Sequence, residues 1–298
     1  MRILVTGTQG QVARALKHVA ENAYQDVEVA LLGRPQIDLA DQQNLHQAIV
    51  ALHPDIVVNA AAYTAVDQAE SHEAQAQAIN ADGAIAVATA TAACNAPIVQ
   101  LSTDYVFDGR SSRPYLEEDE MCPLNAYGRS KAAGETGVAK ANPDHVILRT
   151  SWLYSPYGQN FARTMLRLAG TRDVIRVVAD QNGTPTSVFD IARAIIDIAH
   201  RVTRDDDPAL RGIFHATNQG MTTWADFAQA VFDESAARSS VSARVERITT
   251  QDYPTPARRP PYSVLDNSKL ARTFGIQLPD WRESVGKVIE TCIVNDKS

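Results

Sequence analysis

Short apolar runs alternate with longer mixed stretches through the first half of the chain. The runs are rich in Val, Ile and Leu, and polar residues do not alternate within them, which is typical of strands buried on both faces. These expected strands are 3–5, 27–32, 56–59, 98–102 and 146–149. The stretches between them, 11–21, 41–52, 73–94 and 127–140, are expected helices. Such alternation predicts an α/β fold with a doubly wound parallel sheet of the Rossmann type.

The second half is less regular. We expect helices at 160–170 and 187–202, a strand at 212–217, and a helix that opens at 223–226. Residues 253–261 hold four prolines and cannot form a regular helix. We therefore expect residues 1–150 to form a dinucleotide-binding domain, to which segments near 174–217 return. Residues 151–173 and 218–298 should form a smaller α/β lobe that binds the substrate.

Composition excludes several classes of protein. The chain has 298 residues, of which 45% are hydrophobic, and a net charge of −7, so it lacks the positive field that drives nucleic-acid binding. The sequence offers no apolar run of membrane-spanning length and no signal-peptide core. Cys94, Cys122 and Cys292 form no metal-ligand cluster, and their small odd number fits a reducing compartment. We expect a cytoplasmic protein without nucleic-acid or membrane partners and without a bound metal.

Two glycines follow the first expected strand. Gly7 and Gly10 stand in a turn that opens a helix, and glycines there let the backbone approach a pyrophosphate beside unpaired N–H groups. The spacing G-x-x-G-x-x-A differs from the usual G-x-G-x-x-G, and a tight structural turn would also explain it. Its place directly after an N-terminal strand favours dinucleotide binding.

The second expected strand ends in Gly33 and Arg34, without the acid that usually binds the adenine ribose. Arg34 could pair with a 2′-phosphate, which predicts that NADPH is used at least as well as NADH. A solvated surface arginine is an equally good interpretation. Asp38 and Leu39 follow in a loop that could border the adenine.

The candidate chemistry lies after the fourth strand and in the next helix. Tyr127 and Lys131 stand four residues apart, so they share one helical face. A free tyrosine has a pKa near 10, and a neighbouring lysine charge draws it toward the working range. Lys131 can also hold the nicotinamide ribose, and Thr103 can donate a hydrogen bond to a carbonyl oxygen. Tyr-x-x-x-Lys is common by chance, but this order of motifs predicts a carbonyl reductase with Tyr127 as proton donor.

Seven stretches together resemble the extended short-chain dehydrogenase/reductase family. They are VVNAAAYTAVD from 57, LSTDYVF from 101, YGRSK from 127, LRTSWLY from 148, NFARTML from 160, DQNGTPT from 180 and YPTPARRP from 253. The last two lie outside the cofactor motifs, so they point to a subgroup that reduces nucleotide-linked deoxysugars. The resemblance implies hydride transfer from NAD(P)H to C4 of dTDP-4-dehydro-β-L-rhamnose, the last step of dTDP-L-rhamnose synthesis.

The resemblance also implies roles for individual residues. Tyr127 and Lys131 keep the roles above, and Thr103, Asp104 and Trp152 should touch the sugar. The expected cofactor contacts are Gly7, Gly10, Gln11, Val12, Arg34, Asp38, Leu39, Ala62, Tyr63, Thr64, Leu101, Tyr127 and Lys131. Trp152 offers an apolar face to a pyranose ring, although core packing would explain it too. Arg258 and Arg259 could pair with the nucleotide diphosphate or lie at the surface.

Two alternative functions stay open at this point, together with the question of Mg²⁺ and the oligomeric state. Asp104 directly follows Thr103, so a nucleotide-sugar dehydratase or epimerase on the same fold fits this site as well. A non-catalytic subunit like the regulatory subunit of methionine adenosyltransferase also resembles the chain. Some family members dimerise through Mg²⁺ held by acids that include one in the first helix. Residues 12–16 contain no acid, so a metal-bridged dimer is not carried over, while Mg²⁺ binding and the choice between monomer and homodimer stay open.

Overall fold

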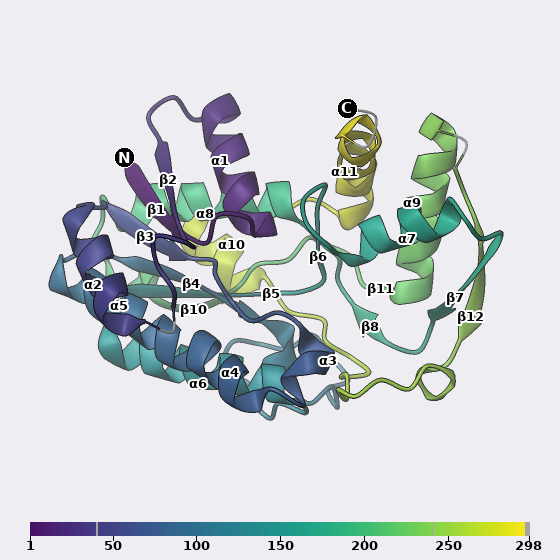
Figure 1. The fold of residues 1–298 in the computed structure, drawn as a ribbon, viewed down its shortest axis with the longest axis horizontal. Helices are drawn as coiled ribbons and strands as arrows, with labels where there is room; N and C mark the ends of the chain where they lie inside the picture. Colours follow the sequence, from purple (N-terminus) through teal and green to yellow (C-terminus); the bar gives the residue numbers. More distant parts are fainter. Residues whose placement is uncertain (40, 240, 296–298) are drawn as a thin grey trace.

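A computed structural model describes residues 1–39, 41–239 and 241–295, and Figure 1 shows its fold. A six-stranded sheet forms its centre, with the strand order β10-β5-β4-β3-β1-β2. All neighbouring strands in it are parallel. These strands are β1 Arg2–Thr6, β2 Glu28–Leu32, β3 Ile56–Asn59, β4 Ile98–Thr103, β5 His145–Thr150 and β10 Gly212–His215. The predicted parallel α/β sheet is confirmed.

Helices cover both faces of this sheet (Figure 1). On one face α1 (Gln11–Ala23) packs against α8 (Val188–Val202), and on the other α5 (Ala84–Ala93) packs against α2 (Gln42–Ala51) and α6 (Ala126–Ala141). Ile3 and Val5 of β1 lie in the core beside α1 and α8, whereas Leu4 lies in the core on the opposite face. The strand runs lack polar alternation because both of their faces are buried.

The stretch 73–94, expected as one helix, is interrupted. It consists of α4 (Glu73–Gln77), the π-helical segment η1 (Ala78–Gly83) and α5. A π-helical turn takes up an additional residue and frequently marks a functional site. The buried Asn80 lies in this segment.

A second core lies among α7 (Phe161–Ala169), α9 (Trp224–Ser239) and α11 (Trp281–Asn295), and it includes Phe227 and Trp281. β7 (Val174–Val178) pairs in parallel with β12 (Arg244–Ile248) outside the large sheet, and Ile175 and Val177 pack into this core. The return to the first domain therefore begins with α8, later than the expected position near residue 174. The pairing with β12 decides this, because it holds β7 in the smaller lobe.

Short elements complete the structure. β6 (Leu153–Tyr154) pairs with β9 (Thr186–Ser187), and β8 (Asn182–Gly183) pairs with β11 (Thr222–Thr223). The others are α3 Val66–Ala69, α10 Ser268–Phe274 and the 3₁₀ turns η2 Asp104–Val106, η3 Pro208–Leu210 and η4 Thr250–Asp252. Residues 253–261 form no helix, as their prolines predict. Among the described residues, every helix is too short or too polar to cross a membrane.

Candidate active site

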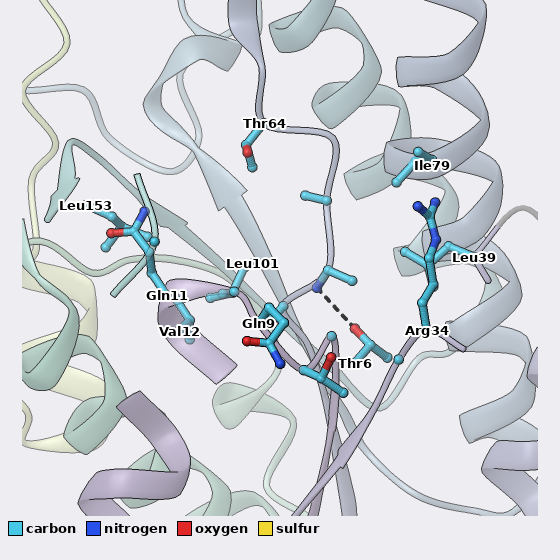
Figure 2. A pocket seen from close by; sticks show the side chains of 18 of the residues that line it. Thr6, Gln9, Gln11, Val12, Arg34, Leu39, Thr64, Ile79, Leu101 and Leu153 are labelled. Carbon is cyan, nitrogen blue, oxygen red and sulfur yellow. Dashed lines mark hydrogen bonds between the residues drawn. The ribbon is translucent and has the colours of Figure 1, made fainter. Parts of the chain in front are cut away.

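A cavity of about 710 Å³ opens at the carboxyl ends of β1, β2, β3 and β4. Ligands of doubly wound sheets bind at this edge, beyond the ends of the strands. Figure 2 shows side chains that enter it from the first turn, from the loop after β2 and from the end of β4. The predicted cofactor residues that line it are Gly7, Gly10, Gln11, Val12, Arg34, Asp38, Leu39, Ala62, Thr64, Leu101, Tyr127 and Lys131. Tyr63 is outside this lining.

The first turn is built to leave backbone donors free. Gly7 has a φ of +92°, which a side chain would strain, and its N–H donates to the Leu32 carbonyl oxygen at 2.7 Å. Gly10 caps α1 without a side-chain hydrogen bond, so the cap residue leaves the first N–H groups of the helix available to a ligand. These groups and the positive end of the helix dipole suit an anionic pyrophosphate.

Arg34 lies at the far end of the cavity, where Leu39 and Ile79 also line the wall (Figure 2). Its Nε is 3.1 Å from Oδ2 of Asp38, and 71% of its side chain is exposed. An exposed ion pair of this kind is weak and easily exchanged. Arg34 can therefore turn toward an added phosphate without a large cost.

Asn80, which the sequence did not suggest as a site residue, fixes the loop after β3. This loop, residues 60–64, is called the cofactor loop. Its Oδ1 accepts from the Tyr63 N–H at 2.8 Å, and its Nδ2 donates to the Tyr63 carbonyl at 3.0 Å and to Ser130 Oγ at 2.9 Å. Ser130 lies between Tyr127 and Lys131 on α6. The π-helical segment thus joins the loop after β3 to the helix that bears the proton donor. An asparagine inside a helical stretch was the only sequence signal, and it is a weak one.

The wall near β1 is also fixed by buried hydrogen bonds. Thr6 Oγ1 donates to Asn59 Oδ1 at 2.5 Å and accepts from the Ala61 N–H at 3.1 Å, the bond drawn in Figure 2. Asn59 Nδ2 in turn donates to Gln100 Oε1 at 2.7 Å. Asn59 therefore ties β1, β3 and β4 together beside the cavity.

Tyr127 and Lys131 both face the inner end of the cavity. α6 begins after Asn125, whose side chain accepts from the Gly128 N–H at 2.7 Å. Lys131 is 4% exposed, and its Nζ donates to the Leu101 carbonyl oxygen at 2.6 Å. Burial lowers the pKa of Lys131 to about 8, although the Glu135 charge raises it.

The expected effect of Lys131 on Tyr127 is not found. Burial raises the pKa of Tyr127 to about 12, and the charge of Asp104 adds to this, while a hydrogen bond with Thr103 opposes it. The reason is geometric, since the Lys131 ammonium is directed at the Leu101 carbonyl and does not offset the burial of the phenol. The phenol therefore keeps its proton at neutral pH, which is the state that a proton donor requires.

Thr103 and Asp104 are both buried and are not part of the cavity lining. Thr103 Oγ1 donates to Asp104 Oδ1 at 3.0 Å and accepts from the Tyr105 N–H at 3.2 Å. Burial raises the pKa of Asp104 to about 7, against hydrogen bonds from Ser263 and Thr103 that lower it. Asp104 thus changes charge close to neutral pH, one residue from the predicted oxyanion donor.

A buried ion pair supports this end of the cavity from below. Arg149 and Glu135 are 1% and 2% exposed, and Arg149 Nη2 lies 2.8 Å from Glu135 Oε2. Ser102 also donates a hydrogen bond to Glu135. The sequence analysis missed this pair, although Glu135 stands one turn beyond Lys131 and Arg149 ends an apolar strand.

Trp152 lies outside the cavity lining. Its φ is +45°, and its ring stacks on Trp224 with centroids 3.5 Å apart and an angle of 8°. A Cβ on Gly183 would come within 2.4 Å of the ring, so only glycine fits there. The predicted contact of Trp152 with a sugar stays a prediction, and Trp224 is a neighbour that the sequence did not suggest.

The two arginines near the C-terminus differ. Arg259 Nη2 lies 2.9 Å from Asp67 Oδ2, and Nη1 lies 3.0 Å from Asp67 Oδ1. Arg258 is exposed, and its side chain makes no hydrogen bond or ion pair with the described residues. Arg259 is therefore already paired within the protein, unlike the free arginine that the diphosphate prediction assumed. Among the described residues, no group of three or more His, Cys, Asp or Glu side chains could hold a metal.

Comparisons with known proteins identify relatives over the full chain. The chain is 50% identical to a dTDP-4-dehydrorhamnose reductase of Sinorhizobium fredii over all of this chain and 99% of the relative. It is 39% identical to that of Escherichia coli, over 97% of each chain.

A solved Bacillus anthracis dTDP-4-dehydrorhamnose reductase in complex with NADP superimposes with a TM-score of 0.88 at 35% identity, covering 97% of this chain and 98% of that one. The family profile described as the RmlD substrate binding domain matches residues 1–294. The resemblance deduced from the sequence is confirmed, and the chain belongs to the RmlD substrate binding domain family.

Proposed function

We propose that this chain reduces the C4 carbonyl of dTDP-4-dehydro-β-L-rhamnose to the alcohol of dTDP-β-L-rhamnose, with NADPH as reductant, in the cytoplasm. Bound in the cavity, the nicotinamide cofactor supplies a hydride to C4. Tyr127 supplies the proton that the carbonyl oxygen takes up. The observation that carries the proposal is a neutral, buried phenol beside Thr103 at the inner end of a dinucleotide-sized cavity.

The residues present fit the cofactor. The first N–H groups of α1 and the Gly7 turn can hold the pyrophosphate. Arg34 and Asp38 lie where the adenine ribose would be placed, and Lys131 lies at the opposite end, where the nicotinamide ribose would be placed. Lys131 would donate a hydrogen bond to a ribose hydroxyl there, since an ammonium has three donors and the Leu101 carbonyl oxygen uses one of them.

Thr103 completes the site as a donor to the carbonyl oxygen. Its hydroxyl lowers the pKa of Tyr127 and now donates to Asp104, so it would turn its proton to a carbonyl oxygen that also accepts from Tyr127. Asp104 and Trp152 are proposed to contact the sugar, and Arg258 the diphosphate.

A direct test follows NADPH oxidation at 340 nm while the nucleotide sugar is generated in situ. Tyr127→Phe removes only the hydroxyl, and we expect kcat to fall roughly 10²-fold or more while NADPH still binds. Tyr24→Phe is the control, because that hydroxyl bonds Asp197 away from the cavity. A dehydratase or epimerase returns its hydride and would show no net oxidation. Cofactor binding without oxidation in the wild type would instead support the non-catalytic subunit.

The preference for NADPH is tested separately. We expect Arg34→Ala to lower the ratio of kcat/KM for NADPH to that for NADH roughly 10-fold, since one charge-assisted contact to the 2′-phosphate is lost. Arg110→Ala removes another exposed arginine that pairs with an aspartate, and it should leave the ratio unchanged. An unchanged ratio in Arg34→Ala would exclude Arg34 from cofactor selection.

A further inference from the structure

Residues 253–261, called the strap below, connect the smaller lobe to the cofactor domain. In Figure 1 the strap is the yellow-green coil that runs from β12 toward α3. Asn125 Nδ2 donates to the Arg258 carbonyl at 2.9 Å, and the Asn182 N–H donates to the Pro261 carbonyl at 2.8 Å. The strap therefore touches the residue that caps α6, two positions before Tyr127.

Arg259 makes the charged contacts that fix the strap. Besides its two bonds to Asp67, its Nη1 donates to Thr255 Oγ1 at 2.6 Å and to the Ala257 carbonyl at 3.3 Å. Its charge also acts on the nearby Tyr105 side chain and favours the ionised form of that phenol. Asp67 accepts from the Ala257 N–H at 3.2 Å, so both partners of the ion pair also hold strap backbone.

Asp67 and Tyr105 belong to the two segments that build the active site. Asp67 is in α3, three residues after Thr64 of the cofactor loop, and Tyr105 follows Thr103 and Asp104. The guanidinium of Arg259 thus connects the strap to α3, which follows the cofactor loop, and lies near the turn after β4.

We propose that the Asp67–Arg259 ion pair holds the strap in place over the nucleotide-sugar site, and that Arg259 is a positioning residue there while Arg258 contacts the diphosphate. The inference rests on the proposed function and refines it. If Arg259 moved to a diphosphate, Asp67 would lose its counter-charge and repel the incoming anion. Arg258 is adjacent, exposed and not engaged by another side chain among the described residues, so it can bind an anion without breaking a bond.

The test is a double-mutant cycle of Asp67→Ala and Arg259→Ala, measured as KM for the nucleotide sugar, kcat, and the NADPH dissociation constant. We expect each single variant to raise KM roughly 10-fold and the double variant to raise it no further, because both remove one interaction. Asp67→Arg combined with Arg259→Asp should recover part of the loss. NADPH binding should stay within about two-fold of the wild type in every variant.

Two arms separate this role from the alternatives. If Arg259→Ala raises KM while Asp67→Ala leaves it unchanged or lowers it, Arg259 is itself the diphosphate ligand and the proposal is overturned. Arg258→Ala should raise KM without loosening the strap, and an unchanged KM would overturn the assignment of Arg258. Arg247→Ala breaks an equally bidentate pair with Asp226 inside the smaller lobe, and it should change neither KM for the nucleotide sugar nor the position of the strap.

A measurement without substrate tests the role of the ion pair even if the proposed reaction is not found. Hydrogen exchange of the strap amides, without substrate, should accelerate at least several-fold in Asp67→Ala and Arg259→Ala and remain unchanged in Arg247→Ala. Accelerated exchange without any turnover would uphold the ion pair's role and reject the reaction alone. Unchanged exchange in both variants would show that the ion pair does not hold the strap.

Discussion

Gly128 directly follows Tyr127, and its place against the turn after β4 makes a sharp prediction. A Cβ at Gly128 would lie 2.2 Å from the Tyr105 carbonyl oxygen and 3.0 Å from Pro123 Cβ, whereas ordinary contact begins near 3.4 Å. The obstacle is backbone, which cannot rotate away as a side chain can. In Gly128→Ala the start of α6 must therefore move by roughly 1 Å, and it carries Tyr127 with it.

We expect Gly128→Ala to lower kcat on the order of 10²-fold, since a misplacement of about 1 Å has effects of that size on positioned catalytic groups. Overpacking costs about 1–3 kcal/mol, and the better helix propensity of alanine returns about 1 kcal/mol, so the free energy of unfolding should fall by up to about 2 kcal/mol. NADPH oxidation and urea unfolding measure the two effects.

Gly137→Ala is the matched control. It lies in the same helix with the same gain in propensity, but its Cβ would meet the Ile85 side chain at 2.3 Å, and a side-chain end can rotate away. Its kcat should stay within a few-fold of the wild type. A folded Gly128→Ala variant with near-normal kcat would refute the reasoning, because it would mean that the Tyr105 backbone yields or that the placement of Tyr127 is not critical.

Two further predictions concern buried charges. Burial raises the pKa of Asp104 from 3.8 to about 7, so the folded state binds this proton more tightly and stability falls as pH rises between these values. Asp104→Asn should remove this loss of stability, which amounts to about 3 kcal/mol between pH 5 and pH 8 in urea unfolding; an unchanged difference between the two pH values would mean that Asp104 does not titrate there. Glu135→Gln leaves Arg149 buried without its counter-charge and should cost about 3–5 kcal/mol, against less than about 1 kcal/mol for Glu73→Gln at the exposed pair with Arg129. Glu135→Gln should also lower the pKa of Lys131, because the Glu135 charge favours the protonated lysine. The fall of kcat/KM at alkaline pH should then begin below pH 8, and an unchanged pH profile would contradict this effect of Glu135.

Several features could be predicted because they depend on local sequence. The strands of the large sheet follow from apolar runs that must be buried on both faces, and the helices between them follow from their length and composition. The Gly7 turn was predictable because a positive φ favours glycine, and its observed φ is +92°. Residues 253–261 form no helix because proline cannot continue one.

Other features depend on contacts between distant segments. The π-helical segment at 78–83 forms where Asn80 bonds Tyr63 and Ser130, and neither partner can be identified from helical spacing. β7 joins the smaller lobe only because β12, more than sixty residues later, pairs with it. No periodicity within one element reports such a partner.

The sequence by itself determined the parallel fold, the glycine turn and the placement of Tyr127 and Lys131 on one helical face, since each depends on neighbours within a few residues. The tertiary structure decided what those groups do. Lys131 bonds the Leu101 carbonyl and burial raises the pKa of Tyr127, so the phenol is held neutral where spacing alone predicted a lowered pKa. Arg259 pairs with Asp67, which lies far away in the sequence and is brought close only by the fold. The protonation state of a side chain, its burial and its hydrogen-bond partner depend on residues that are distant in the sequence. Their distances are set only when the chain has folded.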